Sequence, residues 1–178
     1  AVRQALRRLV AQRGFHGASM SAVAAEAGVA TGTAYTHYGS KDELVLAAYL
    51  ETKAQLGSAA TAEVDPVAEP AERFRQIWLA SYRHLAANRD HALFLLQVDT
   101  SPYRDRAHGA ALAREGDPIL KQAADPAMTA QLLPLPLEIL YELGLAPPVR
   151  LAAHGAALTD ADLEATAEAC WRAITRVR

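Results

Sequence analysis

Cysteine is nearly absent from this chain of 178 residues, which contains a single one, Cys170. One cysteine excludes an intrachain disulfide framework and fits the reducing cytoplasm, where we expect the protein to be located. Because Cys170 lies in an alanine-rich helical stretch, we expect its thiol to be buried and inert. The chain also lacks an apolar run of about 18 residues, which a transmembrane helix requires, so we expect no membrane partner.

Segments in which β-branched and polar residues alternate are missing too, and aromatic residues make up only 6% of the chain. Without such alternation the sequence offers no candidate strands. Hydrophobic residues make up 51% of the chain, and alanine and leucine are prominent among them. We therefore predict an all-α fold, and a chain of this length can bury a sizeable core.

Motifs of the common enzyme classes are absent as well. The sequence contains no HExxH, no glycine-rich phosphate loop and no GxSxG. None of the six histidines has a second His or Cys at close ligand spacing, and His84 and His91 lack a third partner. We therefore expect no catalytic residue, no metal site and no cofactor, and we keep an enzyme or a metal protein as the rival class.

A strong local pattern is present between residues 21 and 38, which read SAVAAEAGVATGTAYTHY. Ser21 can cap a short helix with one apolar face. Gly28 follows at the point where a helix ends best in a left-handed residue. Thr31 can then cap a second helix over residues 32–38. A helix, a tight turn with glycine and a second helix form the helix-turn-helix, whose second helix enters the DNA major groove.

Four short blocks occur in order between residues 14 and 44: GFHGAS, VAAEAGV, GTAYTHY and SKDEL. In these blocks, their order and their spacing, the chain resembles the TetR family of transcriptional regulators. The resemblance covers about residues 1–50, and its departures concern packing more than chemistry. The residues that differ from the commoner family choice are Val23, Ala34 and Tyr38.

The resemblance implies how the chain is organised. Residues 1–50 would form an N-terminal three-helix domain with the helix-turn-helix, and residues 51–178 would form a helical bundle for regulation and dimerisation. Two copies would pair through the last helices, at about 136–154 and 159–176. A two-fold dimer is also what the function requires, because a single short helix reads few base pairs.

Side-chain chemistry and the resemblance together indicate the residues that contact double-stranded DNA. The start of the second helix offers free N–H groups and the positive end of the helix dipole to a phosphate or a base edge. Threonine offers a methyl group and a hydroxyl group to the bases. The helix has no Arg, Asn or Gln for bidentate base contacts, so shape and methyl contacts matter more. The predicted DNA-binding residues are Ser19, Thr31, Gly32, Thr33, Tyr35, Thr36, His37 and Lys41.

Structural alternatives exist for some of these residues. Ser19 can cap a helix, and Tyr35 can pack partly against the protein. Lys41 would stand in the first turn of a fourth helix, where a cation opposes the helix dipole. We interpret this local penalty as a sign that Lys41 serves a phosphate.

The charge distribution supports this assignment only modestly. The net charge of the chain is −2. Residues 1–53 carry six Lys and Arg against four Asp and Glu, whereas the remaining chain carries 12 against 16. The N-terminal part is therefore the more basic one, as a DNA-binding domain requires.

The second half contains aromatic bodies with polar tips, a mixture that is typical of ligand sites. The resemblance implies a small, partly apolar ligand there, although aromatic residues at helical spacing also form ordinary core. The candidate ligand-binding residues are Trp78, Tyr82, Phe94, Gln97, Asp99, Tyr103, His108 and Tyr141.

The resulting hypothesis is a ligand-responsive repressor that binds a pseudo-palindromic operator as a homodimer. A helical adaptor that has lost DNA binding is a third possibility beside the enzyme or metal protein. The sequence leaves open the operator, the ligand, the regulated genes and the sign of the regulation.

Overall fold

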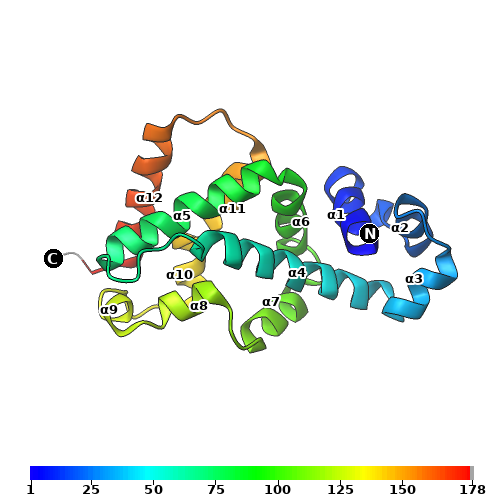
Figure 1. Ribbon diagram of the computed structural model, residues 1–178, viewed down its shortest axis with the longest axis horizontal. Helices are drawn as coiled ribbons and strands as arrows, with labels where there is room; N and C mark the ends of the chain where they lie inside the picture. Colours follow the sequence, from blue (N-terminus) through cyan, green and yellow to red (C-terminus); the bar gives the residue numbers. More distant parts are fainter. Residues whose placement is uncertain (177–178) are drawn as a thin grey trace. The chain divides into compact units, whose positions relative to one another are not determined.

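The computed structural model describes residues 1–176. They form twelve α-helices and one short 3-10 helix, η1, and Figure 1 shows their succession along the chain. Within these residues the β-type pairing is limited to one isolated bridge between Leu132 and Thr175. The predicted all-α fold is confirmed.

The chain divides into two compact units that are not contiguous in sequence. The first unit consists of Ala1–Ala54 and Arg89–Glu115, and the second consists of Gln55–Asn88 and the chain from Gly116 onward. The division by function, into residues 1–50 and 51–178, stays a prediction.

The first unit contains the N-terminal helices and two later ones. Its elements are α1 (Val2–Arg13), η1 (Phe15–Gly17), α2 (Met20–Glu26), α3 (Thr31–Tyr38), the first part of α4 (Lys41–Thr61), α6 (Arg89–Asp99) and α7 (Arg104–Ala113). The helix α1 packs against α2 and α6, because apolar residues recur along it at helical spacing. Its buried apolar residues are Ala5, Leu6, Leu9 and Val10.

An ion pair joins α1 to α4 within this unit. Arg7 is only 5% exposed, and its guanidinium donates to the Glu51 carboxylate at 2.6 Å. Arg3 reaches the other oxygen of the same carboxylate at 2.9 Å. Burial would raise the pKa of Glu51, but Arg7 and then Arg3 outweigh it, so this pKa lies below its ordinary value. The two arginines and Glu51 therefore link α1 to α4, the helices that precede and follow α2 and α3 in the chain.

The second unit contains the end of α4 and six further helices. They are α5 (Pro70–Ala87), α8 (Pro118–Ala123), α9 (Pro126–Thr129), α10 (Leu137–Gly144), α11 (Ala146–His154) and α12 (Asp160–Ile174). Several of these helices begin after a residue whose side chain caps them. Asp117 and Asp125 cap α8 and α9 with Pro in the first turn, and Thr159 forms a capping box with Asp162 at α12.

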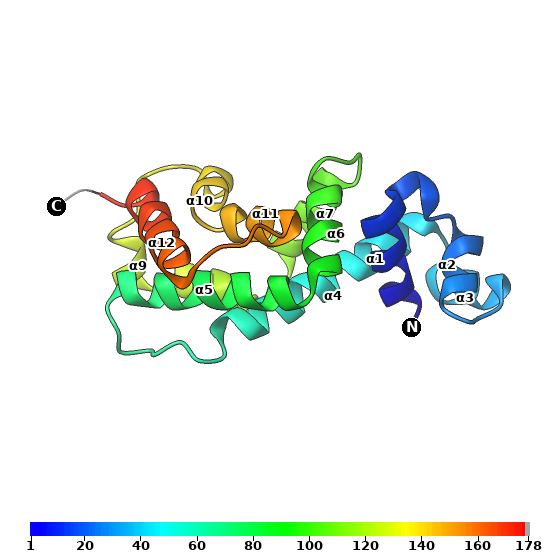
Figure 2. The same cartoon turned by 90° about the horizontal axis from the view of Figure 1, so that it is seen from above.

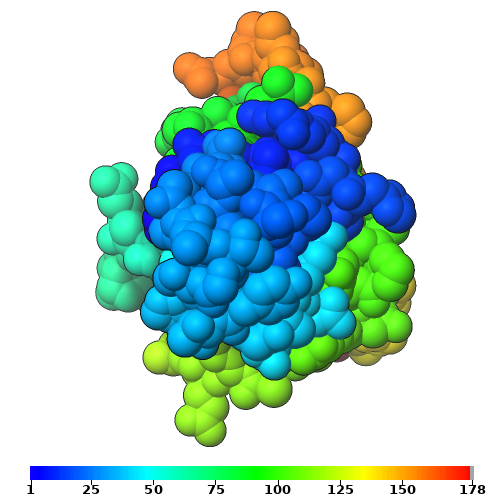
Figure 3. Space-filling model, turned by 90° about the vertical axis from the view of Figure 1, so that its right-hand side faces the viewer, coloured from blue at the N-terminus to red at the C-terminus, as the bar shows by residue number. Residues whose placement is uncertain are grey.

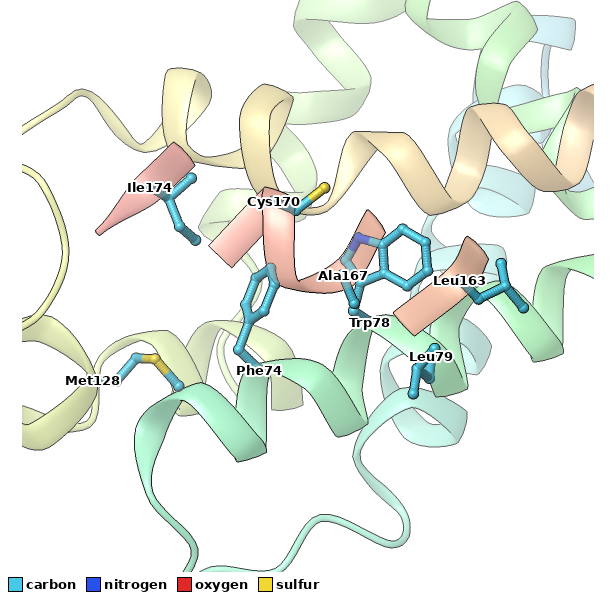
Figure 4. Packing of buried hydrophobic residues seen from close by; sticks show 8 residues of the cluster. All are labelled: Phe74, Trp78, Leu79, Met128, Leu163, Ala167, Cys170 and Ile174. Carbon is cyan, nitrogen blue, oxygen red and sulfur yellow. The ribbon is translucent and has the colours of Figure 1, made fainter. Parts of the chain in front are cut away.

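The core of the second unit lies where α5 packs against α11 and α12, the helices drawn near one another in Figure 2. Figure 4 shows the α5 side chains Phe74 and Trp78 pointing toward α12, where they meet Ala167 and Cys170. Cys170 is 7% exposed, and burial raises the pKa of its thiol, so the predicted buried thiol is confirmed.

None of the helices within residues 1–176 combines the length and the apolar character needed to cross a membrane. Across the same part of the chain, no three His, Cys, Asp or Glu side chains gather where they could hold a metal ion.

Candidate nucleic-acid interface

The helices α2 and α3 form a helix-turn-helix with short, well-defined ends. After α2 the chain turns at Gly28, whose φ of 68° lies in the left-handed region that favours glycine. The N–H of Val29 bonds back to the carbonyl of Ala24 at 3.0 Å and closes the end of the helix. The predicted turn at Gly28 is therefore confirmed.

Both helix starts differ in detail from the prediction. The hydroxyl of Ser19, not of Ser21, accepts a hydrogen bond from the N–H of Ala22 at 3.2 Å and caps α2. The helix begins at Met20, whose side chain is 5% exposed. At α3 the cap position is Ala30, which has no capping side chain, and Thr31 is the first helical residue. Two capping predictions, Ser21 and Thr31, were therefore wrong.

The helix α3 buries one residue and exposes most of the others. Ala34 is fully buried, and Tyr38 at the end of the helix is half-buried. Tyr35 is 49% exposed, so both the predicted DNA contact and the alternative of partial packing against the protein stay open. Figure 3 views the molecule from the side on which α3 lies. The other exposed residues of α3 are Thr31, Gly32, Thr33, Thr36 and His37.

The start of α3 is open to a close approach. A Cβ atom built on Gly32 would meet no other atom within 4 Å. The first N–H groups of a helix have no partner inside that helix, so those of Thr31 and Gly32 point outward at its positive end. This arrangement suits a phosphate oxygen that comes close to the backbone.

The two threonines that follow differ in what they offer. The hydroxyl of Thr36 donates to the carbonyl of Gly32 at 2.9 Å, one helical turn back. Thr33 is exposed, and its hydroxyl makes no hydrogen bond within residues 1–176. Thr33 therefore offers a hydroxyl and Thr36 chiefly a methyl group to a partner molecule.

Lys41 has a partner inside the protein. Its Nζ donates to the carbonyl of Phe15 at 2.5 Å, across the first unit. This contact accounts for a cation in the first turn of α4, which the sequence alone led us to explain by DNA. Ser40 caps α4 as its hydroxyl accepts the N–H of Glu43 at 3.2 Å. A phosphate contact by Lys41 stays a prediction, and it would compete with the Phe15 carbonyl.

Of the arginines on α1, Arg7 is occupied by Glu51, and Arg8 pairs with Glu26 at 3.2 Å. Arg13 is exposed near the end of α1. A phosphate contact by one of these arginines stays a prediction.

The predicted ligand-binding residues divide between the two units. Phe94, Gln97, Asp99, Tyr103 and His108 belong to the first unit, whereas Trp78, Tyr82 and Tyr141 belong to the second. Trp78 and Phe94 are fully buried, which matches the alternative of ordinary core. Their role toward a ligand stays a prediction.

Local contacts among these residues are specific. In the second unit the Trp78 and Tyr82 rings are stacked with their centroids 6.4 Å apart. In the first unit Nε2 of His108 lies 2.8 Å from Asp99, and the imidazole stacks on Tyr49. Beside these residues the ring of Phe15 lies 4.9 Å from that of Tyr103.

A capped first helix, a glycine turn and a second helix that presents threonine, tyrosine and histidine side chains define a helix-turn-helix DNA-binding protein. Residues 2–48 match the family described as bacterial regulatory proteins, tetR family. Residues 70–175 match the tetracyclin repressor-like C-terminal domain. The chain belongs to the TetR family of transcriptional regulators, and it is a DNA-binding regulator with a helix-turn-helix.

Individual relatives match over nearly the whole chain. An uncharacterized HTH-type transcriptional regulator of Haemophilus influenzae is 29% identical over 175 residues, which cover 95% of this chain and 91% of that protein. The crystal structure of a TetR-family regulator from H. influenzae Rd has a TM-score of 0.80 at 26% identity and covers 98% of this chain and 94% of its own. The structure of a TetR-family protein from Vibrio parahaemolyticus has a TM-score of 0.75 at 28% identity, and the match covers 99% of this chain and 97% of that one.

Proposed function

We propose that this regulator is a ligand-responsive repressor that places α3 of each copy in the major groove of a pseudo-palindromic operator. The observation that carries the proposal is the distribution of buried and exposed residues on α3. Ala34 is the one fully buried residue of α3 and Tyr38 is half-buried, while Thr31, Gly32, Thr33, Tyr35, Thr36 and His37 remain exposed. A helix with this composition gains little from folding alone and is suited to a polar partner.

Each exposed residue has a role that its chemistry supports. Thr31 and Gly32 bring backbone N–H groups to a phosphate, and Thr33 adds a hydroxyl to a phosphate or a base edge. Thr36 presents its methyl group to a thymine methyl. The remaining contacts are to phosphate, from the side chains of Ser19, Tyr35, His37 and Lys41.

Two copies of the chain would pair through residues of about 136–154 and 159–176. The helix α12 exposes Ala161, Ala165, Ala169 and Ala173, four small residues at a spacing of one helical turn. Small side chains at this spacing let a second helix approach closely. On α10, Leu137, Ile139 and Leu143 are between 41% and 47% exposed, and a partner would cover them.

A small, partly apolar ligand would act through the helices that follow α4. Its binding would release DNA only if it favours an arrangement of the subunits that DNA disfavours. The protein would work in the cytoplasm, where its DNA target and a reduced Cys170 are both found.

DNA binding is tested by selecting duplexes from a random pool and measuring the affinity of the protein for the selected duplex by fluorescence anisotropy. Tyr35→Ala is expected to weaken binding about tenfold, because each of the two copies loses a polar contact and the two losses together amount to about 1.4 kcal/mol per complex. Leu112→Ala, which shortens a 57% exposed side chain on α7, is the control and should bind as the wild type does. A wild-type protein that binds no duplex at low salt would refute the proposal.

The role of Lys41 is tested by Lys41→Gln, whose amide can still donate to the Phe15 carbonyl. If Lys41 also binds a phosphate, the salt dependence of log Kd flattens by about one unit per subunit. An unchanged slope would assign Lys41 to the internal contact alone.

The dimer is tested by the molar mass in solution at micromolar concentration. Ala169→Glu places a carboxylate on the exposed face of α12 and should give a monomer, because a charge there cannot be buried against a second copy. Ala71→Glu, on an exposed position in the first turn of α5, is the matched control. A monomeric wild type would contradict this part of the proposal.

A further inference from the structure

The start of α7 lies beside the start of α4 in the first unit. The residue before α7 is Tyr103, and its ring lies 4.9 Å from the ring of Phe15. The carbonyl of Phe15 accepts a hydrogen bond from Nζ of Lys41 at 2.5 Å, and Lys41 is the first residue of α4. Phe15 therefore contacts both helix starts, and the first turns of α4 and α7 come close to each other.

One contact between these two turns joins opposite charges. Arg106 is the third residue of α7, and its guanidinium lies 3.9 Å from the carboxylate of Asp42, the second residue of α4. This separation exceeds hydrogen-bond distance, and both side chains are 57% exposed. Such an exposed pair contributes little to stability. By comparison, Arg7 lies 2.6 Å from its carboxylate and is buried.

The guanidinium of Arg106 is available to a partner molecule. Within residues 1–176 its one polar contact is the ion pair with Asp42, and it makes no hydrogen bond there. As a cation in the first turn of α7, it also opposes the helix dipole. The fold therefore keeps an exposed arginine at a position where neither a hydrogen bond nor the helix rewards it.

This arginine stands near the helix that carries the predicted DNA contacts. The helix α3 ends at Tyr38, and Asp42 follows four residues later in the turn that also holds Lys41. When α3 enters the major groove, the phosphates that border the groove pass close to its neighbouring turns. Exposed charges act on phosphates over about 8–10 Å at physiological salt. The Asp42 carboxylate repels a phosphate there, whereas the Arg106 guanidinium attracts it.

We propose that Arg106 binds a phosphate of the operator and thereby extends the DNA-contacting surface beyond the helix-turn-helix to the start of α7. The inference rests on the proposed DNA-binding function. Arginine suits this contact, because two N–H groups of its planar guanidinium can bond to one phosphate at the same time. Its present pairing with Asp42 costs little to give up, since the two groups are exposed and not hydrogen-bonded.

The first test removes the charge of Arg106. Arg106→Gln should weaken binding of the selected duplex roughly tenfold and flatten the dependence of log Kd on log salt by about one unit per subunit. Arg106→Lys keeps the charge and should retain most of the salt dependence. A duplex of scrambled sequence should lose affinity by the same factor, because a phosphate contact carries no base specificity.

The matched control removes an equal charge from the other end of the same helix. Arg114 is exposed and directly follows α7. Arg114→Gln should bind within about twofold of the wild type and keep its salt dependence, because charges farther away than the screening length contribute little. An equal loss in Arg114→Gln and Arg106→Gln would show that only the net charge matters, and it would overturn the proposed contact.

The second test asks whether Arg106 acts only through its ion pair. A phosphate contact predicts opposite effects, in which Arg106→Gln weakens DNA binding and Asp42→Asn strengthens it by removing a repulsive charge. If the ion pair served to hold α7 on α4, both changes would break it and both would weaken binding. Weaker binding by both variants would therefore refute the phosphate contact. The melting temperature of each variant, recorded in parallel, should stay close to that of the wild type.

The outcomes distinguish this inference from the function on which it rests. If the wild type binds no duplex, the DNA-binding proposal and this inference fail together. If the wild type binds and Arg106→Gln matches it in affinity and in salt dependence, DNA binding stands and only the contact by Arg106 is wrong.

Discussion

The helices α3 and α5 use their side chains in opposite ways. The helix α5 buries most of its apolar residues, with Trp78 and Phe74 at the centre of the second unit, and is held by its own side chains. The helix α3 buries Ala34 and exposes its polar residues, and it is held by its neighbours. A helix that reads a partner must leave its surface free, so the energy that positions it has to come from the frame around it.

The largest expected effect is on the free energy of unfolding, and it tests whether the buried side chains of α5 stabilise the protein. Trp78→Ala should lower the free energy of unfolding by about 3–5 kcal/mol, because a fully buried indole leaves a cavity that the core cannot fill. Tyr35→Ala, an aromatic truncation on exposed α3, should change it by less than about 0.5 kcal/mol. Both are measured by chemical denaturation followed by circular dichroism. Equal losses in the two variants would break the comparison.

The next effect concerns the ion pair between Arg7 of α1 and Glu51 of α4, which lies outside α3. Glu51→Gln should lower the free energy of unfolding at pH 7 by about 2 kcal/mol, because it leaves the buried Arg7 without its ionised partner. The pKa of Glu51 is lower in the folded protein than its ordinary value of 4.5, so the pairing stabilises fully above that pH.

The stabilisation is lost as the pH falls from 4.5 through the folded-state pKa, because Glu51 then takes up a proton. The difference between wild type and Glu51→Gln should therefore shrink on acidification, in denaturation curves recorded between pH 7 and pH 3. A constant difference across this window would show that Glu51 acts by packing and not by its charge.

A smaller effect should separate stability from DNA binding on α3 itself. Gly32→Ala meets no neighbouring atom and should stabilise the helix by up to about 1 kcal/mol. Its methyl group would stand between the backbone and a phosphate, so affinity for the selected duplex should fall about tenfold. Gly109→Ala on α7, which also meets no atom within 4 Å, should stabilise without weakening DNA binding. If Gly32→Ala binds the duplex as tightly as the wild type, no phosphate lies close to the backbone of Gly32.

The smallest effect distinguishes two threonines of one helix. Thr33→Val removes a hydroxyl without an internal partner and should weaken binding about threefold. Thr36→Val removes a hydroxyl that already bonds to Gly32, keeps the methyl group, and should bind within about twofold of the wild type. Anisotropy titrations of both variants on one duplex check this. The reverse order would mean that Thr36 turns its hydroxyl to the DNA.

Much of the fold follows from short-range rules in the sequence. Gly28 ends the first helix of the motif, and Thr159 with Asp162 starts α12, because these contacts join residues no more than a few positions apart. The choice between Ser19 and Ser21 as the cap was beyond such rules. Either hydroxyl can reach a free N–H, and in the structure it is Ser19 that accepts the N–H of Ala22, while Ser21 lies inside α2.

The candidate site was predicted only in part for the same reason. The exposure of Thr33 and Tyr35 follows from the motif, whereas the partner of Lys41 does not. Phe15 lies 26 residues before Lys41, and no local signal links the two. The division of the predicted ligand residues between two units is likewise a property of packing, since Phe94 and Trp78 look alike in sequence.

By itself the sequence determined the helices, their caps at Asp117, Asp125 and Thr159, and the polar surface of α3, because helical spacing and hydrogen bonds within one turn act along the chain. Only the tertiary structure decided that Arg7 is buried against Glu51, that Lys41 binds a carbonyl, and that Tyr103 packs on Phe15. These pairs form when helices distant in sequence pack side by side, and the apolar periodicity that drives the packing does not specify which polar groups then meet.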